Sequence, residues 1–381
     1  MKRNNKKILR AVTVSQSLSF CRQVMIKMRT MGYEMVAVTS PGPELDKLRD
    51  EDGFHCVAVP MERHISVVHD LASLCCMIKV LRKERPYVVH SMTPKAGMIC
   101  MLAAWITRVP RRVHTFTGLV WPTATGLKRK VLMMTDWLTC ACATHVIPEG
   151  EGVLNDLKEG GITHKPMKVL GYGNVMGVDM ERFNPVRFVS HKDESAFTFV
   201  FVGRIVGDKG INELVDAFTR LQGKHPNARL VLVGNYEHNL DPVSDATRQM
   251  IDVNEAINAC GPKYGDELLQ QYVDADCFVM PSYREGFPNT VLEAGAMGLP
   301  SIVTDINGSR EIVVNERNGL IVPSKNADAL YEAMLRMMTD DDLRIRMAHD
   351  ARQMIASRFE CGFVQKCQID FYKKIIDCRI C

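Results

Sequence analysis

The stretch Phe199-Val-Phe-Val-Gly-Arg204 decides how the chain is interpreted, because four apolar residues in a row end in a glycine and a cation. A run of this kind is typical of a parallel β-strand that is buried on both faces. Asp208-Lys-Gly210 follows, and apolar residues then recur at helical spacing at Ile211, Leu214, Val215 and Phe218. The sequence therefore predicts a strand, a polar loop and an amphipathic helix, which form one unit of an α/β sheet.

The same alternation of short apolar runs and longer helical patterns extends over most of the chain. Residues 71–83 and 98–107 have helical periodicity. Strand-like runs lie at residues 9–14, 35–39, 56–59, 87–90, 113–116, 145–147, 197–202, 230–233, 277–280, 301–304 and 320–322. Strands that alternate with helices form parallel sheets covered on both faces. The sequence therefore predicts an α/β protein.

Turn-forming residues without helical periodicity gather between residues 171 and 191, which divides the chain. The 381 residues suffice for two domains of ordinary size. We expect two Rossmann-like domains, at residues 1–175 and 176–360, that face each other across a cleft. Residues 361–381 should form an amphipathic helix that packs back on the N-terminal domain. The apolar positions that predict it are Phe359, Phe363, Phe371, Tyr372, Ile375 and Ile376.

Composition excludes several classes of protein. The chain is 46% hydrophobic and 24% charged, which is ordinary for a globular protein and unlike a disordered or coiled-coil chain. The longest strongly apolar stretch, residues 97–107, is about half of the roughly 20 residues that a membrane-spanning helix needs. The 13 cysteines are scattered through apolar runs, so we expect reduced thiols, no metal site and a cytoplasmic location.

Charge is divided unevenly between the two halves. Residues 1–175 hold 25 Lys and Arg against 14 Asp and Glu, whereas residues 176–381 hold 23 against 30. A basic half indicates an anionic partner, such as a membrane surface, a phosphorylated acceptor or nucleic acid. Lys128-Arg-Lys130 precedes an apolar helical pattern with Trp137, which is typical of contact with a membrane surface. An ordinary packed helix would show the same pattern.

Two stretches of the second half carry candidate chemistry. Arg204 and Lys209 follow a predicted strand beside the start of a helix, and these three positive features suit a diphosphate. In Glu285-Gly-Phe-Pro-Asn-Thr-Val-Leu-Glu293, a loop leads into a helix that Asn289 could cap. The two carboxylates could face one crevice and accept hydrogen bonds from sugar or ribose hydroxyls. Solvated loop cations and a Glu293 that only complements the helix dipole are the plainer interpretations.

Gly171-Tyr-Gly-Asn-Val-Met-Gly177 is similar to a dinucleotide-binding fingerprint. That fingerprint needs a helix that starts at the last glycine, so that its N–H groups meet the pyrophosphate. Here residues 179–185 show no apolar helical pattern. An NAD enzyme is therefore disfavoured.

In the first half, polar residues follow two predicted strands, and we expect them to face the second domain. A histidine at the end of a strand is more often structural than functional, so this expectation has a plain alternative. The residues concerned are His90, Lys95, His114, Thr117 and Gly118.

These residues resemble the retaining glycosyltransferases of family 4, which have the GT-B fold of two Rossmann-like domains. The resemblance covers nearly the whole chain. Its most specific part is the pair Glu285 and Glu293, separated by seven residues. Val202-Gly-Arg204 and Gly177-Val-Asp-Met-Glu-Arg-Phe183 match family signatures as well. Within the family, Pro148-Glu-Gly-Glu-Gly152 and residues 90–97 resemble the CapM-like capsular and surface-polysaccharide enzymes of bacteria.

The resemblance implies a role for each matching residue. Arg204 and Lys209, beside Gly203, would bind the donor diphosphate. Glu285 would face the donor sugar, Glu293 would bind the ribose hydroxyls, and Gly261 would line the base pocket. The backbone of the intervening loop would hold sugar and phosphate oxygens at Gly286, Phe287, Pro288, Asn289 and Thr290. The implied reaction moves a hexose or N-acetylhexosamine from a UDP-sugar to a lipid-linked or growing polysaccharide acceptor, without a metal or other cofactor.

Two stretches depart from the family pattern. Thr117-Gly118 stands where many members carry a His-Gly pair whose histidine contacts the donor sugar, and His114 lies three residues earlier. Ser15-Gln-Ser-Leu-Ser19, with Ser17 at its centre, replaces a Gly-Gly loop after the first strand. Both departures lie in the acceptor-facing half, so they leave the acceptor contacts open.

Two other functions stay open at this point. A UDP-sugar 2-epimerase has the same fold and needs no acceptor. A non-catalytic sugar-binding or nucleic-acid-binding protein would use the basic half. That half lacks aromatic residues interleaved with its cations, so we expect no nucleic acid as partner. The expected location is the cytoplasm, with peripheral contact to the inner face of the cytoplasmic membrane.

Overall fold

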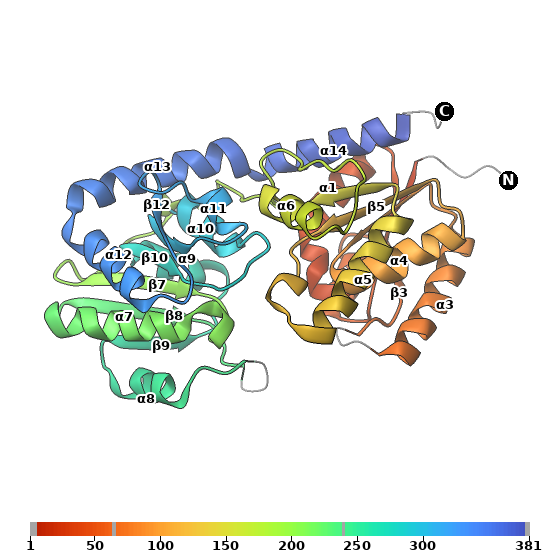
Figure 1. Cartoon of the computed structure of the whole chain (residues 1–381). Helices are drawn as coiled ribbons and strands as arrows, with labels where there is room; N and C mark the ends of the chain where they lie inside the picture. The colour runs from red at the N-terminus through yellow and green to blue at the C-terminus, as the bar shows by residue number, and fades with distance from the viewer. Residues whose placement is uncertain (1–5, 63–65, 238–240, 378–381) are drawn as a thin grey trace. The chain divides into compact units, whose positions relative to one another are not determined.

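The structure, a computed structural model, describes residues 6–62, 66–237 and 241–377. The chain forms two compact units (Figure 1). The N-terminal unit comprises the chain up to residue 176 together with the chain from residue 362 onward, and the C-terminal unit comprises residues 177–361. Each unit contains one six-stranded parallel sheet between layers of helices, which confirms the predicted α/β class.

The N-terminal sheet has the strand order β3-β2-β1-β4-β5-β6. Its strands are β1 (Lys7–Ala11), β2 (Glu34–Thr39), β3 (His55–Ala58), β4 (Val88–Met92), β5 (Arg111–Phe116) and β6 (His145–Pro148). The helices are α1 (Ser19–Thr30), α2 (Pro43–Asp50), α3 (Val67–Glu84), α4 (Pro94–Ile106), α5 (Gly126–Cys142), α6 (Glu151–Glu159) and α14 (Cys361–Asp377), with 3₁₀ turns η1 (Ser15–Leu18) and η2 (Trp121–Thr123).

The C-terminal sheet has the strand order β12-β11-β10-β7-β8-β9. Its strands are β7 (Phe197–Val202), β8 (Ala228–Val233), β9 (Ile257–Gly261), β10 (Cys277–Met280), β11 (Ser301–Thr304) and β12 (Gly319–Val322). The helices are α7 (Ile211–Lys224), α8 (Asp245–Val253), α9 (Gly265–Val273), α10 (Asn289–Ala296), α11 (Ser309–Ile312), α12 (Ala327–Thr339) and α13 (Asp341–Phe359), with 3₁₀ turns η3 (Pro185–Arg187) and η4 (Gly207–Lys209).

The apolar run of β7 is explained by the two cores that it joins. Phe199 and Phe201 lie in the core beneath α7 and α12. Val200 and Val202 lie in the core on the other face, with residues of α9 and α10. Because successive side chains of a strand point to opposite faces, a strand covered on both faces must be apolar at every position.

Two predicted features of the strands differ from the structure, and the predicted turn agrees with it. The first strand ends at Ala11, three residues earlier than predicted, because η1 begins at Ser15. Strand β9 was not predicted, because Ile257 is its single β-branched residue and the strand forms a partly exposed edge of the sheet. No helix begins at Gly177, which confirms that the glycine-rich segment is a turn rather than a dinucleotide fingerprint.

The C-terminal helix α14 completes the core of the N-terminal unit. Ile375 and Ile376 pack with residues of α1 and β1, and the fully buried Tyr372 lies among them. The Tyr372 hydroxyl accepts a hydrogen bond from the guanidinium of Arg10 at 2.5 Å. The prediction that Phe359 belongs to this helix is wrong, because Phe359 ends α13 and lies in a core of the C-terminal unit.

The two points where the chain passes between the units are joined by backbone hydrogen bonds within the C-terminal unit. The Val178 N–H donates to the Phe359 carbonyl at 2.8 Å, and the Cys361 N–H donates to the Val178 carbonyl at 2.9 Å. Gly177 has a φ of +71°, and a Cβ there would lie 2.6 Å from Cys361 Cα. Glycine is therefore required at this junction.

Candidate active site

The order in which the chain adds strands to the C-terminal sheet reverses at β7. From β7 the chain continues to β8 and β9 on one side, and it then returns to form β10, β11 and β12 on the other side. Open α/β sheets bind their ligands at such a reversal, beyond the carboxyl ends of the strands. Arg204 and Lys209 follow β7 and Glu285 follows β10, so the structure brings these three predicted residues to this point.

The loops that follow β7 and β10 are in direct contact. Gly210 has a φ of +70°, and a Cβ there would lie 2.1 Å from the carbonyl oxygen of Pro281. The Tyr283 N–H donates to the Asp208 carbonyl at 2.8 Å. Any side chain at position 210 would force the two loops apart, so the glycine sets how closely the candidate residues meet.

The two predicted diphosphate ligands are in different surroundings. Lys209 forms an ion pair with Glu285, and the two side chains are only 15% and 13% exposed. Arg204 forms an ion pair with Glu237 at 2.8 Å, and its side chain is 45% exposed. Shielding from water strengthens electrostatic interactions, so the Lys209–Glu285 pair is held more strongly than the exposed Arg204–Glu237 pair.

Helix α10 begins directly after the loop that carries Glu285. Its N-cap is Pro288, and no acidic residue lies in its first turn. The N–H groups of a first helical turn and the helix dipole attract anions, so this end of the helix suits a phosphate or a sugar oxygen. The prediction that Asn289 caps the helix is wrong, because Pro288 takes the extended cap position and Asn289 is the first helical residue.

The loop from Gly286 to Thr290 offers its backbone rather than its one aromatic side chain. Phe287 is 6% exposed, and its ring packs edge-on against Phe359 with the ring centroids 5.4 Å apart. A Cβ on Gly308 would lie 2.3 Å from the carbonyl oxygen of Gly286, so the loop rests on a glycine below it. The backbone contacts with a ligand stay a prediction.

Glu293 lies in the second turn of α10. The Tyr272 hydroxyl donates to its Oε2 at 3.0 Å. Burial raises the pKa of Glu293 to about 7, although the Tyr272 hydrogen bond and Arg182 act in the opposite direction. This carboxyl therefore changes its charge near neutral pH, which is typical of residues at functional sites.

Three glycines form a row at the carboxyl ends of β7, β8 and β9. The Gly203 N–H donates to the Val233 carbonyl at 2.9 Å, and the Gly234 N–H donates to the Gly261 carbonyl at 3.0 Å. A Cβ on Gly234 would lie 1.8 Å from the carbonyl oxygen of Gly203, whereas a Cβ on Gly261 would meet open space. The predicted Gly203 and Gly261 are thus brought together by Gly234, which the sequence analysis did not name.

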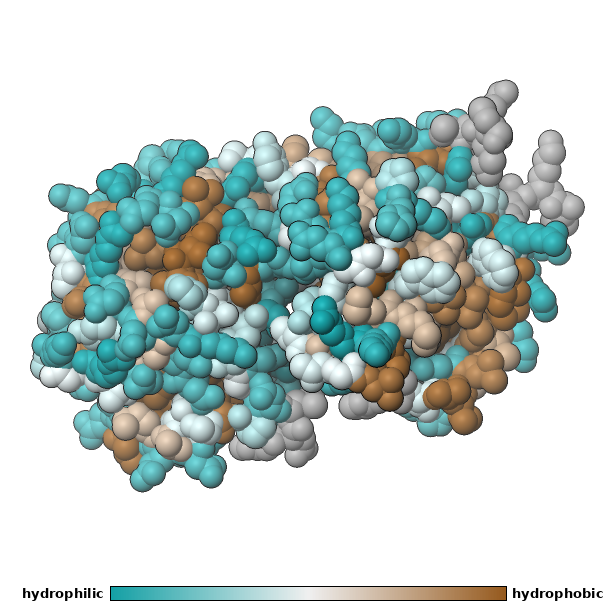
Figure 2. Space-filling view, viewed as in Figure 1, coloured by the Kyte–Doolittle hydropathy of each residue, from teal (hydrophilic) through white to brown (hydrophobic). Residues whose placement is uncertain are grey.

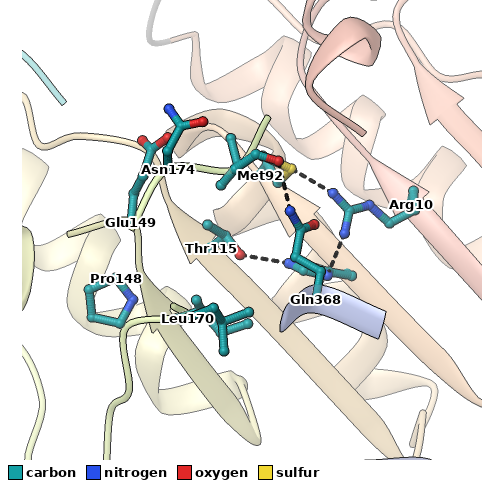
Figure 3. A pocket seen from close by; sticks show the side chains of 11 residues that line it. Arg10, Met92, Thr115, Pro148, Glu149, Leu170, Asn174 and Gln368 are labelled. Carbon is teal, nitrogen blue, oxygen red and sulfur yellow. Dashed lines mark hydrogen bonds between the residues drawn. The ribbon is translucent and has the colours of Figure 1, made fainter. Parts of the chain in front are cut away.

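In the N-terminal unit, His90 was expected to face the second domain, but its side chain is buried, in agreement with the structural alternative. Its Nδ1 accepts a hydrogen bond from Arg10 at 2.7 Å, and its Nε2 lies 2.7 Å from Thr115 Oγ1. Burial, and then the nearby Arg10, lowers the pKa of His90 well below its ordinary value. The neighbouring cavity has a volume of about 10 Å³ (Figure 3), close to the least that holds one water molecule. A sugar acceptor does not fit there.

His114 was also expected to face the second domain, and it is buried by contacts different from those of His90. The side chain is buried, and its Nδ1 lies 2.9 Å from Ser91 Oγ. A Cβ on Gly97 would lie 2.4 Å from the imidazole, so α4 packs directly on the ring. Burial lowers the pKa of His114 to about 3, and the ring is neutral at physiological pH. His114 is therefore part of the core.

The other predicted residues of this unit remain at or near the surface. Lys95 forms an ion pair with Asp70 at 2.6 Å. Thr117 and Gly118 directly follow β5, and Ser17 lies in η1; all three are half-buried. Their contact with an acceptor stays a prediction.

Two acidic residues that were not predicted from the sequence lie beside the candidate phosphate-binding residues. Glu237 pairs with Arg204, and the Asp241 carboxylate accepts a hydrogen bond from the Asp208 N–H at 2.5 Å. Both residues follow β8 in a stretch with no recognisable motif, so only the adjacency of β7 and β8 reveals them. Among the described residues, no group of three His, Cys, Asp or Glu is placed to hold a metal ion.

The raised pKa of Glu293 predicts how stability changes with pH. An ordinary carboxyl titrates near 4.5, so the folded protein binds more protons than the unfolded chain between about pH 4.5 and 7, and this group makes the fold less stable as pH rises through that window. Glu293→Gln removes the titration and keeps an acceptor for Tyr272. Relative to the wild type, its free energy of unfolding should increase from about pH 5 to about pH 8, by at most about 3 kcal/mol.

Urea unfolding at the two pH values measures this difference. The matched control is Glu316→Gln: Arg336 lowers the pKa of Glu316, so this carboxyl is ionised in both the folded and the unfolded state above about pH 5, and the stability difference of this variant should not change with pH. A Glu293→Gln difference that does not change with pH would contradict the prediction.

Comparisons with known proteins assign the family. Residues 19–173 match the glycosyl transferase 4-like domain, and residues 183–354 match the glycosyl transferases group 1 domain. The chain is 33% identical to the capsular polysaccharide biosynthesis glycosyltransferase CapM of Staphylococcus aureus, over 94% of this chain and 95% of that protein.

A second relative and a solved structure agree. The chain is 30% identical to the UDP-Gal:alpha-D-GlcNAc-diphosphoundecaprenol alpha-1,3-galactosyltransferase of Escherichia coli, over 84% of this chain and 83% of that protein. The crystal structure of Anabaena Alr3699/HepE in complex with UDP is similar in fold, with a TM-score of 0.78 at 16% identity, over 97% of this chain and all of that one (100%). The chain therefore belongs to the family 4 glycosyltransferases and has their GT-B fold.

Proposed function

We propose that the protein moves a hexose or N-acetylhexosamine from a UDP-sugar to a lipid-linked or growing surface-polysaccharide acceptor, with retention of the anomeric configuration. The observation that carries the proposal is the meeting of Arg204, Lys209 and the N-terminus of α10 where the C-terminal sheet reverses. Together these groups suit a diphosphate. The name of the Escherichia coli relative specifies UDP-Gal and a diphosphoundecaprenol acceptor, which supports the proposal.

The site would act mainly by electrostatic stabilisation. As the bond between the anomeric carbon and the diphosphate oxygen breaks, negative charge grows on the leaving diphosphate and positive charge grows on the sugar. Arg204, Lys209 and the N–H groups of α10 would stabilise the diphosphate, because charges fixed in place before the reaction need no reorganisation during it. Glu285 would face the sugar and favour its positive charge, and Glu293 would accept hydrogen bonds from the ribose hydroxyls.

The departing phosphate would accept the proton of the attacking acceptor hydroxyl. This route keeps the acceptor on the same face of the sugar as the leaving group, and so it retains the anomeric configuration without a protein base. Because protein cations supply the positive charge, we propose that turnover needs no metal ion.

The acceptor would be reached at a membrane surface. Helices α3, α4 and α5 cover the same face of the N-terminal sheet, and their outer surface carries large exposed apolar side chains. These are Val67, Val68, Leu71, Trp105, Ile106, Leu127, Met134 and Trp137, and Figure 2 shows apolar residues gathered over this part of the unit. Exposed apolar patches of this kind mark interaction sites.

Charge favours an anionic bilayer as the partner of this surface. The exposed cations of residues 128–130 directly follow Leu127 on α5. Apolar side chains beside basic ones are the pattern of helices that lie on anionic membranes. None of the described helices is long and apolar enough to cross a membrane. On the strength of the exposed apolar and basic side chains, we propose peripheral contact with the inner face of the cytoplasmic membrane. The free cysteines are typical of a reducing compartment.

Thermal unfolding with UDP, GDP, ADP and NAD tests the donor site. UDP at about 100 times its dissociation constant should stabilise the fold by roughly 2.7 kcal/mol, and the other nucleotides should give little or no shift. Glu293→Ala should lose the UDP shift, whereas Glu316→Ala should keep it. If no nucleotide stabilises the wild type, the donor-site assignment fails.

A transfer assay tests the chemistry. The donors are UDP-galactose, UDP-glucose and UDP-N-acetylgalactosamine, and the acceptor is N-acetylglucosamine linked to diphosphoundecaprenol. We expect an α-linked product by NMR, an unchanged rate in excess EDTA, and a loss of about 10²–10³ in kcat for Lys209→Ala. Arg220→Ala, on α7, is the control that keeps the rate. A β-linked product, or turnover that stops in EDTA, would contradict the mechanism, and a changed sugar nucleotide without acceptor would indicate an epimerase.

Sedimentation with lipid vesicles tests the membrane surface. The wild type should bind phosphatidylglycerol vesicles and should not bind phosphatidylcholine vesicles. Replacing residues 128–130 together by serine should weaken binding on the order of a hundredfold, at about 1 kcal/mol for each cation. The double replacement Lys373→Ser and Lys374→Ser, on α14, should have little effect. Equal binding of the wild type to both lipids would argue against an electrostatic contact.

A further inference from the structure

Of the chain segment after β8, residues 234–237 and Asp241 lie beside the loop after β7 that carries Arg204 and Lys209. The Ile205 N–H donates to the Asn235 carbonyl at 2.8 Å, and the Gly207 N–H donates to the Asp241 carbonyl at 2.8 Å. Gly234 allows this close approach, because a Cβ there would collide with the Gly203 carbonyl. The two stretches therefore share one position beside the candidate diphosphate site.

Within this segment, Glu237 holds the guanidinium of Arg204. Arg204 Nη1 donates to Glu237 Oε2 at 2.8 Å, and the side chains are 45% and 33% exposed. Asp241 differs, because its carboxylate accepts a backbone hydrogen bond from Asp208. The Asp241 carboxylate thus holds the loop, whereas among the described residues the contact of the Glu237 carboxylate is the ion pair with Arg204.

A carboxylate and a phosphate bind a guanidinium in the same way. Arginine offers a planar fork of N–H donors, and either anion can accept two of them. A diphosphate that approaches Arg204 therefore competes with Glu237 for the same donors. After displacement, the Glu237 carboxylate stays near a like charge, which is unfavourable.

From these contacts we propose that Glu237 is an internal counter-ion, which occupies Arg204 in the absence of a donor and weakens the binding of the donor diphosphate. The inference rests on the proposed donor site. An exposed ion pair is weak, so Glu237 cannot fix Arg204 in one position, and it yields to a stronger anion. The Lys209–Glu285 pair is shielded from water and would not yield in this way.

The test is calorimetric titration of the full-length protein with UDP at fixed ionic strength. Glu237→Gln should bind UDP about two- to fivefold more tightly than the wild type, in keeping with the strength of exposed ion pairs. Glu316→Gln, which loses an ion pair with Arg336 elsewhere in the same unit, should bind like the wild type. Thermal unfolding without ligand checks that each variant is folded.

A double-mutant cycle ties the effect to Arg204. In an Arg204→Lys background, where the point charge lacks the planar fork, Glu237→Gln should give a smaller gain or none. Unchanged or weaker UDP binding by folded Glu237→Gln would overturn the role of Glu237 alone. A wild type that does not bind UDP would overturn the proposed donor site, and this inference with it.

Discussion

A parallel strand that is covered on both faces has only its ends available for polar chemistry. In β7, Phe199 and Phe201 fill one core and Val200 and Val202 fill the other, so the strand offers no side chain to a ligand. The first residues beyond it are Gly203 and Arg204. The same holds for β10, whose polar continuation carries Glu285 and leads into α10. Burial of the sheet thus decides that the candidate site consists of loops and one helix start.

The two units provide partners for their cations in different ways. In the C-terminal unit, each candidate cation has a carboxylate partner: Glu285 for Lys209 and Glu237 for Arg204. In the N-terminal unit, Arg10 is fully buried among uncharged groups and donates to Tyr372 and to the neutral His90. A charge without any partner would be costly for the shielded Lys209 and the buried Arg10, and less so for the exposed Arg204. The first arrangement leaves Arg204 open to a competing anion, whereas the second closes a core.

Sequence patterns predicted the central elements well, because strands buried on both faces leave an unmistakable apolar run. The predicted bounds of β7, β10 and β11 agree with the structure residue for residue. The edge strand β9 was not predicted, because a strand at the edge of a sheet needs fewer apolar residues. The spacing of Glu285 and Glu293 predicted that a loop leads into a helix between them. The structure places this loop and the start of α10 beside the point where the strand order of the sheet reverses.

The partners of individual side chains on distant segments were beyond prediction. Burial of His90 depends on Tyr372, more than 280 residues away, and the pairing of Arg204 with Glu237 depends on how two neighbouring loops run beside each other. Neither leaves a local trace in the sequence. The same limit applies to His114, which is buried because α4 packs on its ring at Gly97.

The passage of α14 into the N-terminal core has a consequence for synthesis of the protein. The N-terminal domain is not a continuous piece of chain, since Tyr372, Ile375 and Ile376 are among the residues that fill its interior. On the ribosome, most of this domain is made first, but its core cannot be completed before α14 is made. The C-terminal domain has nearly all its residues before that point. Until α14 has been made, the face of β1 and α1 that it covers stays open to water, to chaperones and to other nascent chains.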